Sequence, residues 1–94
     1  MPSESSFQGI IVGLCKECGI LAIPIAGRGR AGVPDLLMVG HGIVELWELK
    51  VKGGRLRPQQ KLLIPKLRDA GAVVRIVVGL DEARKLIDEW NTDV

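Results

Sequence analysis

The stretch VELWELK, residues 44–50, decides the fold, because it alternates like a β-strand yet carries charges where a strand should be apolar. Successive side chains of a strand point to opposite faces of the sheet. Glu48 and Lys50 therefore share one face, whereas Glu45 lies on the other. Ionised side chains are costly to remove from water. The stretch thus predicts a sheet strand that carries a charged site.

The segments around this strand predict a small mixed α/β domain. Hydrophobic spacing and the positions of glycine, proline and cap residues predict helices at 4–18, 58–70 and 81–90, and strands at 20–25, 35–39, 43–51 and 72–79. Asp81 is expected to be the N-cap of the last helix. The order predicts a mixed sheet flanked by helices. At 94 residues, the chain is expected to form one domain, residues 1–94.

The middle of the chain is basic and the remainder is acidic, although the net charge is only +2. Between positions 28 and 61, three acidic residues stand against seven basic ones, which are Arg28, Arg30, Lys50, Lys52, Arg55, Arg57 and Lys61. This distribution predicts one positive face. No segment is long enough to span a membrane, and the N-terminus lacks a signal-peptide pattern. A cytoplasmic protein is therefore expected.

Cys15 and Cys18 form a CxxC motif within the first predicted helix. Zinc would need a second pair of ligands, and the sequence holds a single histidine, His41. A thiol-redox function would need an unusually acidic thiol. Two reduced thiols of a cytosolic protein are the expected state, and a redox protein is the alternative.

Polar residues recur at positions where the pattern predicts burial. Glu48 lies on the central strand, Asp35 begins the preceding strand, and Glu4 and Gln60 fall on the apolar stripes of two helices. Each alone has a plainer interpretation: a turn cap for Asp35, a simple Glu48–Lys50 ion pair, and contact with water for the two helix residues. Together they favour Mg²⁺ or Mn²⁺, because a divalent cation offsets carboxylate repulsion and prefers oxygen ligands.

These residues resemble the signature of the PD-(D/E)xK nuclease superfamily, in which Pro34-Asp35 is followed on the next strand by Glu48-Leu49-Lys50. A longer pattern resembles the VRR-NUC family of virus-type replication-repair nucleases and extends from Glu4 to about Ile87. It comprises Glu4 with Gln8, GVPDLL at 32–37, ELK at 48–50, PQQK at 58–61 and LRDAG at 67–71. The resemblance implies a restriction-endonuclease-like core and a stand-alone nuclease domain of a phage or prophage.

The resemblance also implies a divalent-metal-dependent endodeoxyribonuclease. Its implied catalytic residues are, in chain order, Glu4, Asp35, Glu48, Lys50 and Gln60. The three carboxylates and the backbone carbonyl of Leu49 would bind Mg²⁺ or Mn²⁺, and a metal-activated water would attack the phosphodiester. Lys50 would orient the water or stabilise developing charge. Gln60 would hydrogen-bond the lysine or the water.

Basic residues beside these acids are expected to contact phosphates, which position DNA without reading its sequence. They are Arg28, Arg30, Lys52, Arg55 and Arg57. Taken singly, each is more typical of a solvated surface charge, and only their clustering favours DNA.

A domain of this size has little surface with which to read a branched substrate. A homodimer that cuts branched double-stranded DNA, with four-way (Holliday) junctions as leading substrate, is therefore expected in a bacterial host cell. The helix around Trp90 and a sheet edge are the alternative interfaces. The alternative functions are a flap-type or general DNA nuclease of the same fold and a non-catalytic DNA-binding module.

Overall fold

A computed structural model of the chain describes residues 4–27 and 29–92, and it describes the side chains of residues 6–27 and 29–91. The elements are α1 (Glu4–Glu17), β1 (Leu21–Pro24), β2 (Leu36–Gly40), β3 (Ile43–Lys50), α2 (Pro58–Asp69), β4 (Val74–Val78) and α3 (Leu80–Thr92). The predicted order of helices and strands is confirmed, and every predicted range overlaps the observed element.

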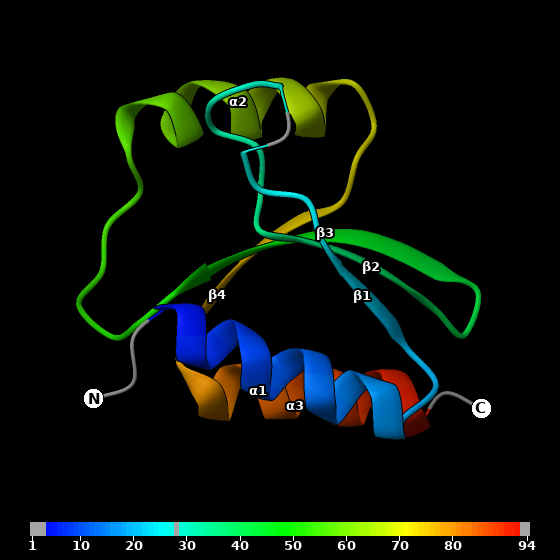
Figure 1. Cartoon of the computed structure of the whole chain (residues 1–94). Coiled ribbons are helices and arrows are strands. Elements are labelled where there is room, and N and C mark those ends of the chain that lie inside the picture. The colour runs from blue at the N-terminus through cyan, green and yellow to red at the C-terminus, as the bar shows by residue number, and fades with distance from the viewer. Residues whose placement is uncertain (1–3, 28, 93–94) are drawn as a thin grey trace.

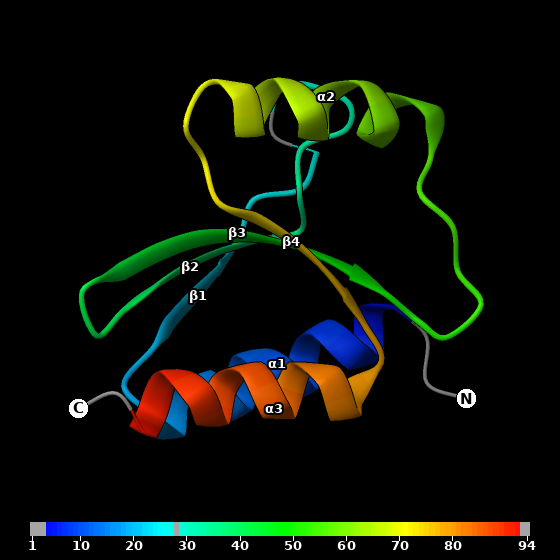
Figure 2. The ribbon, with the colours of Figure 1, turned by 180° about the vertical axis from the view of Figure 1, so that it is seen from behind.

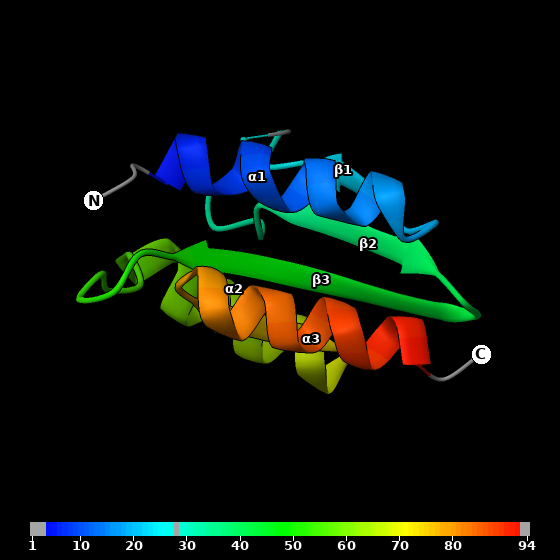
Figure 3. The same cartoon turned by 90° about the horizontal axis from the view of Figure 1, so that it is seen from below.

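The strands form one mixed four-stranded sheet in the order β1-β2-β3-β4. β2 is antiparallel to β1 and to β3, whereas β4 is parallel to β3 because α2 forms the crossover between them. α2 covers one face of the sheet, and α1 and α3 lie side by side on the other (Figure 1, Figure 3). Seen from behind, β4 leads from the α2 layer to the start of α3 (Figure 2).

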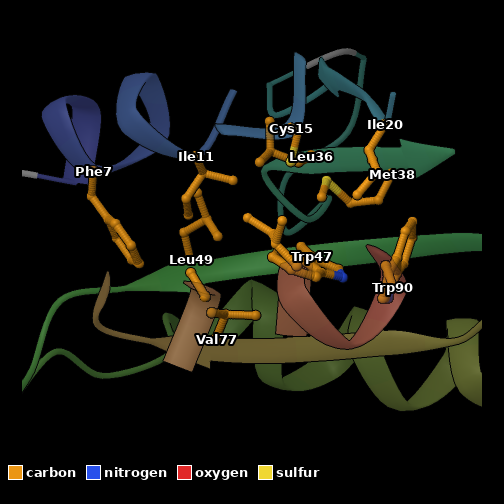
Figure 4. Packing of buried hydrophobic residues seen from close by; sticks show 12 residues of the cluster. Phe7, Ile11, Cys15, Ile20, Leu36, Met38, Trp47, Leu49, Val77 and Trp90 are labelled. Carbon is orange, nitrogen blue, oxygen red and sulfur yellow. The ribbon is translucent and has the colours of Figure 1, made fainter. Parts of the chain in front are cut away.

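The main core lies between the sheet and the layer formed by α1 and α3 (Figure 4). Phe7 and Ile11 project from α1 at helical spacing and are buried. Trp47 of β3 is fully buried, and its ring lies edge-to-face against Trp90, with centroids 6.1 Å apart. Trp90 is only 4% exposed, so its side chain belongs to the core, and the helix around it stays a predicted dimer interface. The large ring of Trp90 fills space in the core.

Glu45 is a second buried carboxylate on β3, and it lies on the core face, as the strand alternation predicts. It accepts hydrogen bonds from Trp47 Nε1 at 3.0 Å and from two guanidinium nitrogens of Arg75 at 2.7 and 3.0 Å. This hydrogen bonding raises the pKa of Arg75 above its ordinary value. Glu45 therefore has local partners of its own and belongs to the packing of β3 against β4.

α3 begins one residue earlier than predicted. Gly79 has a φ of 84°, and its carbonyl accepts the first helical hydrogen bond from Ala83. Asp81, the expected N-cap, lies in the first turn, where its charge complements the helix dipole. No helix among the described residues combines the length and the apolar composition needed to cross a membrane.

Candidate active site

Asp35 is held on both sides at the start of β2. Its carbonyl accepts a hydrogen bond from the Ile25 N–H at 2.9 Å, and its Oδ2 accepts one from the Leu49 N–H at 2.7 Å. The β2–β3 register pairs Leu36 with Trp47, so the next step outward sets Asp35 opposite Glu48. Directly opposed residues of antiparallel strands project to the same face. Two carboxylates from neighbouring strands therefore share the face that α2 covers.

Glu48 and Lys50 are buried together on one face of β3, as the sequence predicts. They are 1% and 4% exposed, and Lys50 Nζ lies 3.3 Å from Glu48 Oε2. Gln60 Nε2 donates to the same oxygen at 2.7 Å. The ammonium and the amide thus offset the cost of burying the carboxylate.

Gln60 reaches Glu48 because of its place in α2. Pro58 occupies the first turn, where a missing N–H costs nothing. Gln60 is the third helical residue, and its Oε1 accepts the Arg57 N–H at 2.8 Å. This half of a capping box orients the amide so that Nε2 faces the sheet. The predicted burial of Gln60 is observed, at 9% exposure.

Pro34 interrupts the backbone pairing beside Asp35. The Lys50 carbonyl accepts a hydrogen bond from Gly79 on the β4 side, so the backbone groups of the preceding residue, Leu49, point toward β2. The register sets Pro34 opposite Leu49, and proline has no N–H to donate. The Leu49 carbonyl therefore cannot receive a ladder hydrogen bond from position 34, and it points to the side on which Asp35 lies.

The donor set fits a hard divalent cation. Asp35, Glu48 and the Leu49 carbonyl offer oxygen atoms from two adjacent strands, and Mg²⁺ is commonly held by one or two carboxylates while it keeps several waters. Among the described side chains, no group of three His, Cys, Asp or Glu gathers at one point. Water and substrate oxygens would complete the coordination. Glu4 begins α1, but its side chain lies outside the described residues, so its metal-binding role stays a prediction.

Two of the basic residues predicted to contact DNA lie together. Arg30 and Arg57 line a hollow of about 240 Å³ between the glycine-rich loop (residues 26–34) and the start of α2, and Gln60 forms part of its wall. We call this feature the arginine hollow. It adjoins the carboxylate site, because Gln60 also contacts Glu48.

The other predicted DNA contacts are not brought to this hollow. Lys52 lines a separate depression beside Gly79 and Leu80. Arg55 is exposed in the loop before α2. Arg28 lies outside the described residues. Their contribution to DNA binding stays a prediction.

Gly32 is a site residue whose role the sequence did not disclose. Its φ is 90°, and a Cβ at this position would lie 2.5 Å from the Gln59 carbonyl oxygen. The glycine-rich loop can therefore approach the first turn of α2 only because position 32 has no side chain. The motif Gly-Val-Pro-Asp carried a signal of tight geometry, but its contact partner lies 27 positions along the chain.

The cysteines have the character of structural thiols. Both are free; Cys15 is fully buried and Cys18 is partly exposed. Burial, and to a lesser extent the neighbouring Cys18, raise the pKa of the Cys15 thiol from 9.0 to about 11. A redox-active thiol has a lowered pKa, so this environment disfavours the thiol-redox alternative.

Comparison with known proteins agrees with the observed fold. No protein-family model and no curated protein matches the chain. Among solved structures, one titled "VRR_NUC domain" superposes with a TM-score of 0.78 at 28% sequence identity, over 90% of this chain and 94% of that chain. The likeness spans nearly the whole of both chains. This likeness supports a nuclease domain of the VRR-NUC family.

Proposed function

We propose that this domain is a divalent-metal-dependent endodeoxyribonuclease that hydrolyses phosphodiesters in branched DNA. The observation that supports it most is the set of contacts around Glu48. One buried carboxylate oxygen is held by Gln60 at 2.7 Å and by Lys50 at 3.3 Å, and Asp35 stands opposite on the next strand. Buried ionisable groups that converge in this way are typical of functional sites.

In this proposal the chain's own residues hold and orient the reactants. Asp35, Glu48 and the Leu49 carbonyl hold Mg²⁺ or Mn²⁺, with Glu4 as a further ligand. When bound, the ion supplies a lowered water pKa and offsets the charge that develops on the phosphoryl group. Lys50 orients the attacking water or stabilises that charge. Gln60 keeps Glu48 in position, and an amide does so at any pH because it does not titrate.

The reaction is hydrolysis with in-line displacement. The oxygen of water forms a bond to phosphorus, and one bond from phosphorus to a sugar oxygen breaks. One strand end keeps the phosphate, and the other leaves as a hydroxyl that receives a proton. Phosphorus keeps its oxidation state, so no redox partner is needed.

The branched substrate follows from size and charge. The sequence has no tyrosine, and its single phenylalanine, Phe7, is buried. Stacking of bases on these side chains is therefore not the proposed means of recognition. A two-fold dimer would set two such sites on two strands. We propose a homodimer that makes paired cuts across a four-way junction. Flap-type or general nuclease activity of the same fold ranks second.

A substrate panel tests this function. Linear, flap and four-way DNA are each incubated with Mg²⁺, with Mn²⁺ and with EDTA, and the mass of the protein is measured by light scattering. Cutting of the four-way substrate by a dimer, only with metal, is expected. Preferential cutting of flaps or linear DNA would favour flap-type or general nuclease activity. Cutting by a monomer would refute the proposed homodimer.

A non-catalytic DNA-binding module is separated from an enzyme by Asp35→Ala. The enzyme should lose cutting in this variant and keep most of its affinity for DNA, measured by fluorescence anisotropy. A binding module would show no metal-dependent cutting even in the wild type.

A further inference from the structure

The arginine hollow has the composition of an anion site. Its lining residues are Gly27, Arg30, Ala31, Gly32, Val33, Arg57, Gln59 and Gln60. Arg30 and Arg57 are both exposed, and no acidic residue is among the lining residues. Guanidinium groups bind phosphate oxygens through paired N–H donors, which gives geometric as well as electrostatic selectivity. Two arginines that line one small hollow suit one phosphate group.

The hollow is built by close packing of two segments that are distant in sequence. Gly32 lies so close to α2 that a Cβ there would be 2.5 Å from the Gln59 carbonyl oxygen and 2.7 Å from its carbon. This approach brings the loop that carries Arg30 beside the helix start that carries Arg57. A larger residue at position 32 must push the loop away and widen the hollow.

Gln60 connects the hollow to the carboxylate site. Its Oε1 accepts the Arg57 N–H at 2.8 Å, and its Nε2 donates to Glu48 Oε2 at 2.7 Å. One side chain therefore bridges the residue that lines the hollow and the carboxylate. Gln60 lines the hollow and also contacts Glu48, so a phosphate bound in the hollow would be a neighbour of the scissile one along the same backbone.

We propose that the arginine hollow binds one internal, non-scissile phosphate of the strand being cut, and that Arg30 and Arg57 are its ligands. This seating sets the register of the strand, so that the scissile phosphate falls at Asp35 and Glu48. Gly32 is a positioning residue, since it permits the loop to close on α2. The proposal rests on the proposed nuclease function and adds which part of the substrate is held beside the site.

Binding without cutting gives the first test. All measurements use Asp35→Asn protein and a four-way junction, by fluorescence anisotropy over a salt series. The variant R30Q/R57Q should bind more weakly, and the slope of log affinity against log salt should fall by about 1, as for one lost phosphate contact. The matched control R84Q/K85Q removes two charges from α3, on the other face of the sheet, and should leave the slope closer to the parent. Equal effects of the two variants would overturn the proposal.

A scan of neutral linkages gives the second test. One phosphate at a time near the cut position is replaced by an uncharged methylphosphonate. Replacement of one particular internal linkage should weaken DNA binding by the Asp35→Asn parent. The same replacement should not weaken binding further when the protein also carries R30Q/R57Q. Gly32→Ala, if circular dichroism shows it folded, should lose sensitivity at the same linkage. Absence of such a linkage, or sensitivity only to a terminal phosphate, would refute the assignment.

The two proposals can fail separately. If the wild-type protein never cuts with metal, the nuclease function falls whatever the linkage scan reports. If it cuts but the scan finds no coupled linkage, only the arginine hollow assignment falls.

Discussion

The backbone N–H of Leu49 donates a 2.7 Å hydrogen bond to Oδ2 of Asp35, at the point where the backbone pairing of β2 and β3 ends. The carboxylate takes the place that a strand carbonyl would have filled in the ladder. Asp35 is therefore positioned by the same strand that carries Glu48. The Asp35 side chain thus joins β2 to β3, and Pro34 lies at the position where the backbone hydrogen bonds between the two strands end.

Asp35→Asn should separate chemistry from stability. The asparagine side chain keeps an oxygen that can accept the Leu49 N–H, so the free energy of unfolding should stay within about 1 kcal/mol of wild type. Cutting should be lost, because a neutral amide is a poor ligand for Mg²⁺ or Mn²⁺. Denaturant unfolding and a single-turnover cleavage assay measure the two effects. Cleavage at the wild-type rate would remove Asp35 from the catalytic set.

Pro34→Ala should weaken metal binding without touching a ligand. Alanine restores an N–H opposite the Leu49 carbonyl, and that N–H would occupy the oxygen proposed for the cation. Mn²⁺ affinity, measured by isothermal titration calorimetry after dialysis against EDTA, should fall about tenfold, in the range found when groups that orient a metal ligand are changed. Pro24→Ala, at the exposed end of β1, is the control. Unchanged Mn²⁺ affinity in the Pro34 variant would show that the Leu49 carbonyl is not a ligand.

Gln60→Met should destabilise the fold, because it removes two hydrogen bonds. The substitution keeps a long flexible side chain but leaves both Glu48 Oε2 and the Arg57 N–H without their amide partner, which costs about 1–3 kcal/mol. The neighbour Gln59 is exposed, so Gln59→Met should change the free energy of unfolding by no more than about 0.5 kcal/mol. Equal stability of the two variants would argue that the bridge contributes little.

The two thiols should differ in reactivity at pH 8. Cys15 is fully buried with a pKa near 11, whereas Cys18 is partly exposed. Iodoacetamide should therefore modify Cys18 much faster, as peptide mass spectrometry would measure. Faster labelling of Cys15 would contradict the structural assignment, and replacing both cysteines by Ser should leave DNA cutting intact.

The raised pKa of Cys15 also predicts a pH dependence of stability. The ordinary thiol value is 9.0 and the folded value is about 11, so the fold favours the neutral thiol. Its contribution is complete below pH 9 and is lost as pH rises through about 11. The measured quantity is the difference in the free energy of unfolding between wild type and Cys15→Ala, so that effects common to both proteins cancel. That difference should shrink between pH 9 and 11, and a constant difference would exclude the linkage.

The sequence by itself determined the order of elements and which face of β3 carries Glu48 and Lys50. Strand alternation in VELWELK separated Glu48 and Lys50 from Glu45, and helical spacing placed Gln60 on the buried stripe of its helix. These are local patterns, because the periods of 2 and 3.6 residues follow from backbone geometry alone. The sequence also predicted that Asp35 lies near Glu48, because a short turn joins its strand to the next.

Only the tertiary structure decided which distant segments meet. Trp90 packs against Trp47, 43 positions earlier. The five arginines and lysines near the acids were equivalent in sequence, yet among those described only Arg30 and Arg57 share a hollow. The contact of Gly32 with Gln59 explains why. Loop approach depends on the packing of α2 across the sheet, and no local period encodes that contact.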